Sequence, residues 1–296
     1  MFIIKRIIEH FGLQVISMNE VEDSFSSNVY KCELLRGATV FIKIPYTKLK
    51  FQRELEAYEI LKGRIAIPDM LDCWFGDEEC PSAFLLSELK GQPLTPVASP
   101  KAVYHVGVIH ASMHSIQLPI TNELIAIQNE FPNWSDFLES KFYSFAVDVR
   151  DVLDEHLYEQ AIEKFEIMKR QLPAPDGPSL VHMDFRPANI IVDDNQVSGI
   201  IDFESVRFGS TEIDFTKIYR DILSCDHTLY QAYKEGYKSI RPLIDLDIVL
   251  PFYRFTDAFN SIGWCKKRGM EKNAAFLEEN LAILKKLLPS NRSEGK

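Results

Sequence analysis

The stretch from Leu180 to Glu204, LVHMDFRPANIIVDDNQVSGIIDFE, decides how this chain is interpreted. It contains Asp184 and Asn189 in a tight segment, and Asp202 follows after two short apolar runs. The runs NIIV and GIIDF are typical of strands, and DDNQ between them is typical of a hairpin turn. Such a hairpin would return Asp202 towards Asp184 and Asn189. The sequence therefore predicts that two carboxylates and an amide converge.

This set of side chains suits magnesium-assisted chemistry. Asn189 and Asp202 offer the hard oxygen ligands that Mg²⁺ prefers, and Mg²⁺ commonly completes its shell with water and substrate phosphates. Asp184 is then available to accept a proton from an attacking hydroxyl group. Taken singly, each of the three is also an ordinary turn or hairpin residue. The prediction rests on their occurring together with a matching upstream segment.

A lysine in an apolar strand supplies that upstream feature. Lys43 lies in FIKIP, where an inward ammonium group is costly unless a carboxylate neutralises it. Glu54 follows in the next helical segment and is placed to supply the carboxylate. A strand lysine, a helix glutamate, a catalytic aspartate and an Asn/Asp metal pair occur in this order in protein kinases. The alternative is a strand lysine that reaches solvent and an exposed helix acid.

The order of elements predicts an α+β chain with two lobes. Residues 13–45 contain alternating runs typical of strands, and residues 48–62 have the apolar spacing of a helix. MLDCWFG and AFLLSEL are further strand-like runs, and GQPLTPVASP has the Pro, Gly and Ser content of a linker. We expect a small antiparallel-sheet lobe with one helix at residues 1–90, a linker at 91–100 and a larger, mostly helical lobe at 101–296.

Composition excludes several classes of protein. The net charge of −10 argues against a nucleic-acid partner, which usually requires a basic surface, and is compatible with a cationic small molecule. No apolar run approaches the roughly 20 residues that span a bilayer, so no membrane partner is expected. The start, MFIIKRIIEHFG, carries charges within its apolar run and predicts an amphipathic helix rather than a targeting segment. Scattered cysteines without a CxxC pair indicate reduced thiols and a cytoplasmic location.

The segment HMDFRPANIIVDDNQVSGIIDFESVRFGSTEIDF resembles the signature of the aminoglycoside phosphotransferase and choline kinase-like families. Those families share the protein-kinase fold but phosphorylate small molecules. Asp-Phe-Glu in place of Asp-Phe-Gly, and the lack of an APE motif, favour this branch over the protein kinases. The resemblance spans about residues 15–215 and implies a two-lobed, protein-kinase-like fold.

The resemblance also implies a role for each matching residue. Asp184 matches the families' catalytic base, and Asn189 and Asp202 match their metal ligands. Lys43 and Glu54 match the ion pair that helps to bind the nucleotide. The implied cofactors are Mg²⁺ and a nucleoside triphosphate, either ATP or GTP, as phosphate donor.

Two positions depart from the usual sequence motif of these families. Met183 stands where Gly or Asn is common, and we expect this change to alter local packing only. Arg186 occupies a position that is often His in these families and Lys in many protein kinases. Its cation could contact the transferring phosphate. It could equally pair structurally with Asp184 or Glu204.

Two segments are predicted to hold the nucleotide. EDSFSSNVY precedes a strand, and the antibiotic kinases have similarly Ser-rich loops at this place. A plain hairpin turn is the alternative. The candidates for phosphate contacts in this loop are Ser26, Ser27 and Asn28. AFLLSELKGQPL resembles the hinge between lobes, where the Ser87 carbonyl and the Leu89 N–H would meet the purine edge.

The acceptor site is predicted from charge. In SKFYSFAVDVRDVLDEHLYEQ, Asp148, Asp151 and Glu155 would share one face of a single helix and could hold ammonium groups of an acceptor. A solvated acidic face is the alternative. Lys217 and Arg220 would oppose a polycationic acceptor if they face the cleft.

Other residues are weaker candidates for the acceptor site. Asp226 and Asp257 could add to an acidic surface. The aromatic residues Tyr253, Phe255 and Trp264 could line an apolar or quaternary-ammonium pocket, or they belong to the core.

We therefore predict an enzyme that moves the γ-phosphate of ATP or GTP to a hydroxyl of a small molecule. An aminoglycoside-like or related antibiotic is the leading acceptor, which would make the role antibiotic resistance. The alternatives are a metabolic kinase acting on choline, homoserine or a sugar, and a non-catalytic, pseudokinase-like nucleotide-binding protein. The intact set of Lys43, Asp184, Asn189 and Asp202 argues against the last.

Overall fold

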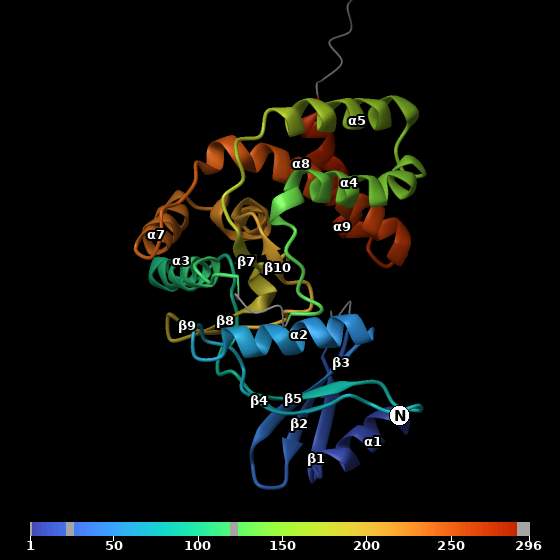
Figure 1. Ribbon diagram of the computed structural model, residues 1–296, viewed down its shortest axis with the longest axis vertical. Coiled ribbons are helices and arrows are strands. Elements are labelled where there is room, and N and C mark those ends of the chain that lie inside the picture. Colours follow the sequence, from blue (N-terminus) through green and yellow to red (C-terminus); the bar gives the residue numbers. More distant parts are fainter. Residues whose placement is uncertain (1, 22–26, 119–123, 289–296) are drawn as a thin grey trace, which may run out of the picture. The chain divides into compact units, whose positions relative to one another are not determined.

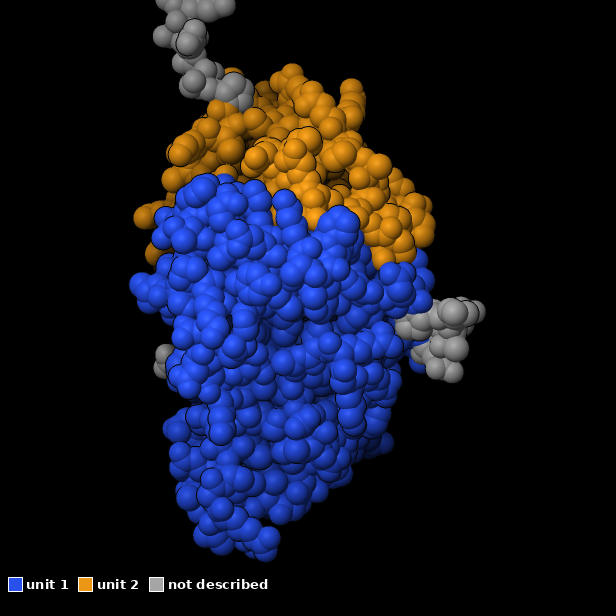
Figure 2. All heavy atoms as spheres, turned by 90° about the vertical axis from the view of Figure 1, so that its left-hand side faces the viewer, with its two compact units in different colours: residues 1–129, 179–208, 217–242 blue, residues 130–178, 209–216, 243–296 orange. Residues whose placement is uncertain are grey.

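A computed structural model of the protein describes residues 2–21, 27–118 and 124–288. The chain forms two compact units (Figure 2), and both contain completely buried apolar side chains. The first comprises residues 1–129, 179–208 and 217–242, and the second comprises residues 130–178, 209–216 and 243–296. Among the described helices, none is long and apolar enough to cross a membrane.

The first unit begins with a helix and a five-stranded antiparallel sheet (Figure 1). The elements are α1 (Phe2–His10), β1 (Val15–Glu20), β2 (Ser27–Leu34), β3 (Thr39–Pro45), α2 (Lys48–Leu61), β4 (Met70–Trp74) and β5 (Ala83–Ser87). The strands lie in the order β1-β2-β3-β5-β4. These elements confirm the strands predicted at residues 13–45, the helix at 48–62 and the two strand-like runs after it.

The two faces of β3 have different partners. Ile42 and Ile44 are buried in one cluster with residues of α1, whose buried positions confirm the predicted amphipathic helix. Because side chains alternate along a strand, the intervening Lys43 points to the opposite face. On that face Phe84 of β5, the register partner of Lys43, stacks on Phe51 of α2 with ring centroids 4.5 Å apart. The sheet therefore directs the Lys43 ammonium group towards α2.

A three-stranded sheet carries the hairpin predicted from the opening stretch. β6 (Gln92–Pro93), β8 (Ile190–Asp193) and β9 (Gln196–Ile200) lie in the order β6-β8-β9. The hairpin turns at Asp194 and Asn195, which both have positive φ angles, as a tight two-residue turn requires. β6 lies inside the predicted linker, because the chain there pairs with β8 on its way to the next helix.

Two helices of the first unit are in close contact. α3 (Pro100–His114) packs on α7 (His227–Lys238) through Gly107 and Gly236. A Cβ on Gly107 would lie 2.2 Å from the carbonyl oxygen of Tyr233, so only glycine permits this approach.

The remaining elements connect these parts of the fold. α6 (Phe215–Ile218) and the π-helix η4 (Tyr219–Leu223) precede α7. β7 (Ser179–Val181) pairs with β10 (Arg207–Gly209).

The second unit is helical. Its elements are η1 (Phe131–Asn133), α4 (Trp134–Arg150), α5 (Glu155–Arg170), η3 (Thr211–Asp214), α8 (Leu246–Arg268) and α9 (Ala274–Leu287). Phe142 of α4 stacks on Phe165 of α5 at 3.9 Å and on Phe259 of α8 at 4.1 Å. Tyr253 and Phe255 are also buried, so they belong to this core rather than to an open pocket.

The predicted single helix carrying Asp148, Asp151 and Glu155 is wrong. α4 ends at Arg150, and a second helix, α5, begins at Glu155. The physical reason is a cap: the Asp154 side chain accepts a hydrogen bond from the N–H of Leu157 at 2.9 Å. An aspartate in this position favours starting a new helix over continuing the old one.

Candidate active site

A buried ion-pair network lies between the five-stranded sheet and the hairpin of the first unit. The Lys43 ammonium lies 2.8 Å from the Glu54 carboxylate and 2.7 Å from that of Asp202. Burial alone would lower the pKa of Lys43, but the surrounding carboxylates, Asp202 first, outweigh burial and raise it. The carboxylates thus favour the charged form of Lys43, and the sequence prediction that Glu54 pairs with it agrees with the geometry.

The two carboxylates of this network differ in environment. Glu54 is completely buried, and burial raises its pKa to about 7 although Lys43 acts in the opposite direction. Asp202 is partly exposed, and although burial opposes its ionisation, the ammonium of Lys43 lowers its pKa. Asp202 is thus an ionised carboxylate with one oxygen held by Lys43 and the other facing away from that bond.

The segment that carries Asp184 is held by its neighbouring histidine. The His182 Nε2–H donates to the carbonyl oxygen of Ile201 at 3.0 Å, and its Nδ1 accepts from the Asp184 N–H at 3.3 Å. Met183 between them has a φ angle of 69°. Gly and Asn adopt this left-handed conformation at the least cost, whereas a methionine there is strained. The substitution by methionine thus concerns the backbone and not packing only.

Asn189 connects the Asp184 segment to the hairpin. Its Nδ2 donates to the Asp184 carbonyl oxygen at 2.9 Å and to Asp184 Oδ2 at 3.2 Å. Its own carbonyl oxygen accepts from the N–H of Ile201 at 3.0 Å. The structure therefore bonds Asp184 to Asn189 and joins Asn189 to the residue directly before Asp202, as the convergence predicted from the opening stretch requires.

Two cations flank the Asp184 carboxylate. Arg186 Nε lies 3.2 Å from Oδ2, and Lys217 of α6 forms an ion pair with Oδ1. Burial favours the protonated form of Asp184, but Lys217 and then Arg186 overcome it and hold the pKa of this carboxyl well below its usual range. Of the two roles left open for Arg186, the structure shows the pairing with Asp184.

The residues at this place fit a divalent magnesium ion. The hydrogens of the Asn189 amide are directed to Asp184, so its Oδ1 accepts no hydrogen bond from the described residues. Asp202 likewise has an oxygen that the described part of the chain leaves without a donor. An amide oxygen and a carboxylate oxygen are ligands that Mg²⁺ binds well.

The predicted nucleotide residues lie around the same sheet. Ser26 lies outside the described residues. Ser27 and Asn28 begin β2, opposite Pro45 and Ile44 of β3, and Asn28 accepts a hydrogen bond from Tyr46 at 3.1 Å. They are therefore next to the strand that carries Lys43.

The predicted hinge residues have different neighbours. Ser87 exchanges hydrogen bonds with Asp69: its N–H donates to the Asp69 carbonyl at 2.9 Å, and its Oγ accepts from the Asp69 N–H at 2.8 Å. Leu89 lies against β9, where a Cβ on Gly199 would come within 2.7 Å of its Cδ1. Gly199 thus leaves room for the Leu89 side chain. The contacts of both residues with a purine stay a prediction.

The structure does not gather the predicted acceptor residues into one group. Asp151 and Glu155 pair with Lys266 at 3.6 Å and with Arg150 at 2.8 Å. Asp226 caps α7 by accepting from the Thr228 N–H at 2.6 Å. Asp257 and Trp264 both lie on α8, and Trp264 packs edge-on against Phe276.

A buried glutamate that the sequence did not reveal lies on α2 close to Glu54. The carboxylate of Glu56 accepts hydrogen bonds from three successive backbone N–H groups, those of Ile125, Ala126 and Ile127, at 2.9–3.1 Å. Arg53 on the same helix donates to the Ala126 carbonyl at 3.1 Å. The segment 125–127 is therefore bound to the helix that positions Glu54.

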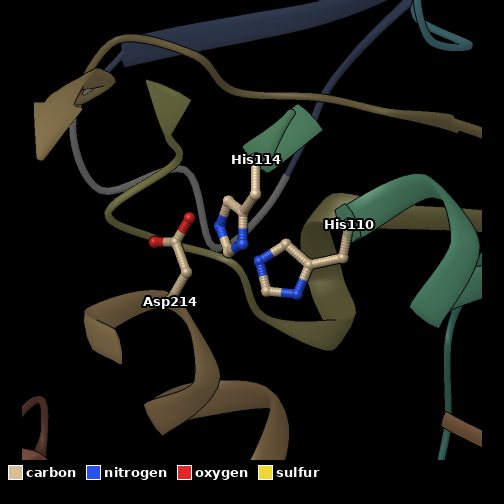
Figure 3. Close-up of side chains that lie close together, drawn as sticks. All are labelled: His110, His114 and Asp214. Atoms are coloured by element: carbon tan, nitrogen blue, oxygen red, sulfur yellow. The ribbon is translucent and has the colours of Figure 1, made fainter. Parts of the chain in front are cut away.

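A pair of histidines on α3 packs against the segment that carries Asp184. Figure 3 shows the side chains of His110 and His114, one turn apart on α3. The Nδ1 atoms of these histidines hydrogen-bond to the hydroxyls of Tyr233 at 2.5 Å and Tyr237 at 2.8 Å. His110 also stacks flat on Phe185, with ring centroids 3.7 Å apart. Because Phe185 follows Asp184 directly, this contact fixes the backbone that carries the carboxylate.

The sequence from residue 17 to residue 247 matches the model of the phosphotransferase enzyme family called APH. The chain belongs to this family. The phosphotransferase is a kinase-type enzyme, and the resemblance proposed from the HMDFRPAN stretch is confirmed. No curated protein matches its sequence significantly.

Solved structures similar to this phosphotransferase confirm the two-lobed α+β, protein-kinase-like fold. The GDP and kanamycin complex of APH(2")-IIia is 15% identical with a TM-score of 0.76, over 96% of this chain and 97% of that one. The ternary complex of a thermostable APH(4)-Ia mutant with AMP-PNP and hygromycin B is 17% identical with a TM-score of 0.69, over 95% and 97%. The macrolide 2'-phosphotransferase MphH from Brachybacterium faecium is 17% identical with a TM-score of 0.67, over 94% and 96%.

Proposed function

We propose that this phosphotransferase transfers the γ-phosphate of ATP or GTP to a hydroxyl group of an aminoglycoside-like or related antibiotic. The observation that carries the proposal is the bonded assembly of Lys43, Glu54 and Asp202 beside Asp184 and Asn189. It contains every group that phosphoryl transfer requires: a fixed cation, oxygen ligands for a metal and an ionised base. The similarity to antibiotic kinases supports the choice of acceptor.

Each residue has a separate task in this mechanism. Lys43, held by Glu54, binds phosphate oxygens of the nucleotide. Asn189 and Asp202 would hold Mg²⁺, which would supply positive charge to neutralise the phosphates. Asp184 orients the acceptor hydroxyl and takes its proton as the new oxygen–phosphorus bond forms and the bond to the leaving nucleoside diphosphate breaks. The acceptor residues Asp151, Glu155, Asp226, Asp257 and Trp264 stay candidates within the proposal.

A metabolic kinase is the second candidate, and one observation favours it. Lys217 pairs with Asp184 and thus brings a positive charge beside the place where an acceptor hydroxyl must bind. A neutral or singly charged metabolite tolerates that charge better than a polycation does. We place either enzyme in the cytoplasm, where the five free cysteines would stay reduced.

An acceptor screen tests the proposal. The purified protein is incubated with Mg²⁺ and either ATP or GTP, together with kanamycin, hygromycin B, a macrolide, choline, homoserine or a sugar. Phosphorylated product is followed by mass, and the isosteric Asp184→Asn variant is the matched control. We expect a product with an antibiotic that the control does not form. Product from a metabolite alone would select the metabolic kinase, and nucleotide binding without any turnover would indicate a pseudokinase.

A further inference from the structure

Lys217 lies at the candidate active site but belongs to none of the sequence motifs described above. It lies 33 residues after Asp184 in sequence, yet its ammonium pairs with Asp184 Oδ1. Ile218 next to it and Ile222 one turn later are completely buried, and both belong to the compact unit that carries Asp184. A π-helix, Tyr219–Leu223, follows directly, and such segments often occur at functional sites because they redirect side chains.

The bonds of Asp184 leave little room for an acceptor. An ionised carboxylate accepts about four hydrogen bonds, about two at each oxygen. Oδ2 already accepts from Arg186 Nε and from Asn189 Nδ2, both at 3.2 Å. Oδ1 accepts from Lys217 alone among the described residues. An acceptor hydroxyl therefore has one place to bind, on Oδ1, and there it lies beside the Lys217 ammonium.

Both cations that contact Asp184 lie at this place. Arg186 Nε is 3.2 Å from Oδ2, and the Lys217 ammonium pairs with Oδ1, the oxygen that is left for the hydroxyl. The Lys43 ammonium pairs with Glu54 and Asp202 instead. A second ammonium group carried on the carbon next to the acceptor hydroxyl would be repelled at short range.

We propose that Lys217 is a positioning residue that holds Asp184 Oδ1 for the acceptor hydroxyl, and that it selects hydroxyls whose neighbouring carbons carry no ammonium group. This inference rests on the proposed function, because it takes Asp184 as the base. It narrows the acceptor to a class: an antibiotic or metabolite that presents a hydroxyl flanked by neutral groups, whatever charges it carries elsewhere.

The first test compares three variants with the wild type: Lys217→Met, Lys217→Arg and the surface control Lys238→Met. The measured quantities are kcat and the KM for ATP in Mg²⁺-dependent turnover, with either kanamycin or water as acceptor. We expect Lys217→Met to lower kcat by roughly 10–100-fold because the base loses its orientation. The KM for ATP should stay unchanged, since the lysine acts on the base and not on the nucleotide. Lys217→Arg should retain most of the activity, and Lys238→Met all of it.

The outcomes separate this inference from the proposed function. Full kcat in Lys217→Met, or equal losses in the Met and Arg variants, would overturn the role of Lys217 while Asp184→Asn remains inactive. Activity in Asp184→Asn, or no turnover at all in the wild type, would overturn the proposed function and the role of Lys217 with it. A thermal melt of each variant shows whether a loss of activity reflects unfolding.

The second test locates the phosphate on the product. Each acceptor that the wild type phosphorylates is analysed by phosphorus and proton NMR to identify the modified hydroxyl. We expect a hydroxyl without an amine on either neighbouring carbon. A wild-type product phosphorylated next to an amine would overturn the selection. In Lys217→Met we expect the fraction of such products to rise.

Discussion

Two groups of acidic residues in this phosphotransferase have opposite characters. The site acids of the first unit, Glu54, Asp184 and Asp202, each pair with a cation from another element of the fold, and Glu54 is fully buried. The acids of the second unit, Asp151 and Glu155, have side chains that are 60% and 58% exposed. Both groups form ion pairs, so pairing alone does not distinguish a site from a surface.

The two groups differ in the free energy that is lost when their charges are removed from water. An exposed pair replaces contacts with water by similar contacts and contributes little. A buried charge loses its hydration, and it persists only where several partners compensate for the loss. Buried acids whose pKa is shifted by such surroundings are candidates for function, whereas the exposed row can be explained by solubility alone. The following mutations test whether this contrast is real.

The largest effect is expected for Asp184→Ala. Removing a positioned base typically lowers the rate by about 10²–10⁴-fold, and the orientation of the acceptor hydroxyl is lost with it. Nucleotide binding should survive, because Lys43 and Glu54 are untouched. Steady-state kinetics and nucleotide titration measure the two effects. A near-normal kcat on the true acceptor would exclude Asp184 as the base.

Asp202→Asn should have the next largest effect. The amide replaces a charged oxygen ligand and also removes one carboxylate from Lys43, so we expect a higher Mg²⁺ requirement and at least about a tenfold lower turnover. The measurement is the rate as a function of Mg²⁺ concentration at saturating nucleotide. An unchanged Mg²⁺ dependence would remove Asp202 from the metal site.

Glu56→Gln tests whether a buried, bonded acid outside the catalytic set also matters more than an exposed acid, in this case for stability. The amide cannot accept all the backbone N–H bonds, and donors left unsatisfied should cost roughly 1–3 kcal/mol of stability. Glu59→Gln, an exposed change on the same helix, is the matched control and should have almost no effect. Denaturant unfolding monitors both. Equal stabilities of the two variants would mean that the segment 125–127 is not held by Glu56.

The smallest effect is expected for the exposed row. If Asp151 and Glu155 bind ammonium groups of the acceptor, the double change Asp151→Asn, Glu155→Gln should raise the acceptor KM only about several-fold, since each exposed pair contributes roughly 0.2–1 kcal/mol. The KM for the nucleotide should not move. Added salt should weaken acceptor binding more in the wild type than in the variant. Equal salt dependence with an unchanged acceptor KM would leave the row as a solvated surface.

The sequence by itself determined the local parts of this protein. Alternating apolar residues predict β2 and β3, apolar spacing predicts α2, and the turn residues Asp194 and Asn195 predict the hairpin. The set Lys43, Glu54, Asp184, Asn189 and Asp202 was found because these residues recur in a fixed order with strong local patterns around them. Asp154 is also recognisable from the sequence as a helix cap, and it separates Glu155 from the helix that ends at Arg150.

Only the tertiary structure decided which distant groups meet. Lys217 on Asp184, Glu56 on the segment 125–127 and His110 on Phe185 each join elements that are far apart in sequence. No periodicity marks such residues, because a pattern along one helix or strand records which face is buried and not which partner covers it. The left-handed backbone at Met183 depends in part on such a distant contact, because His182, which accepts the Asp184 N–H, is itself bonded to the carbonyl oxygen of Ile201.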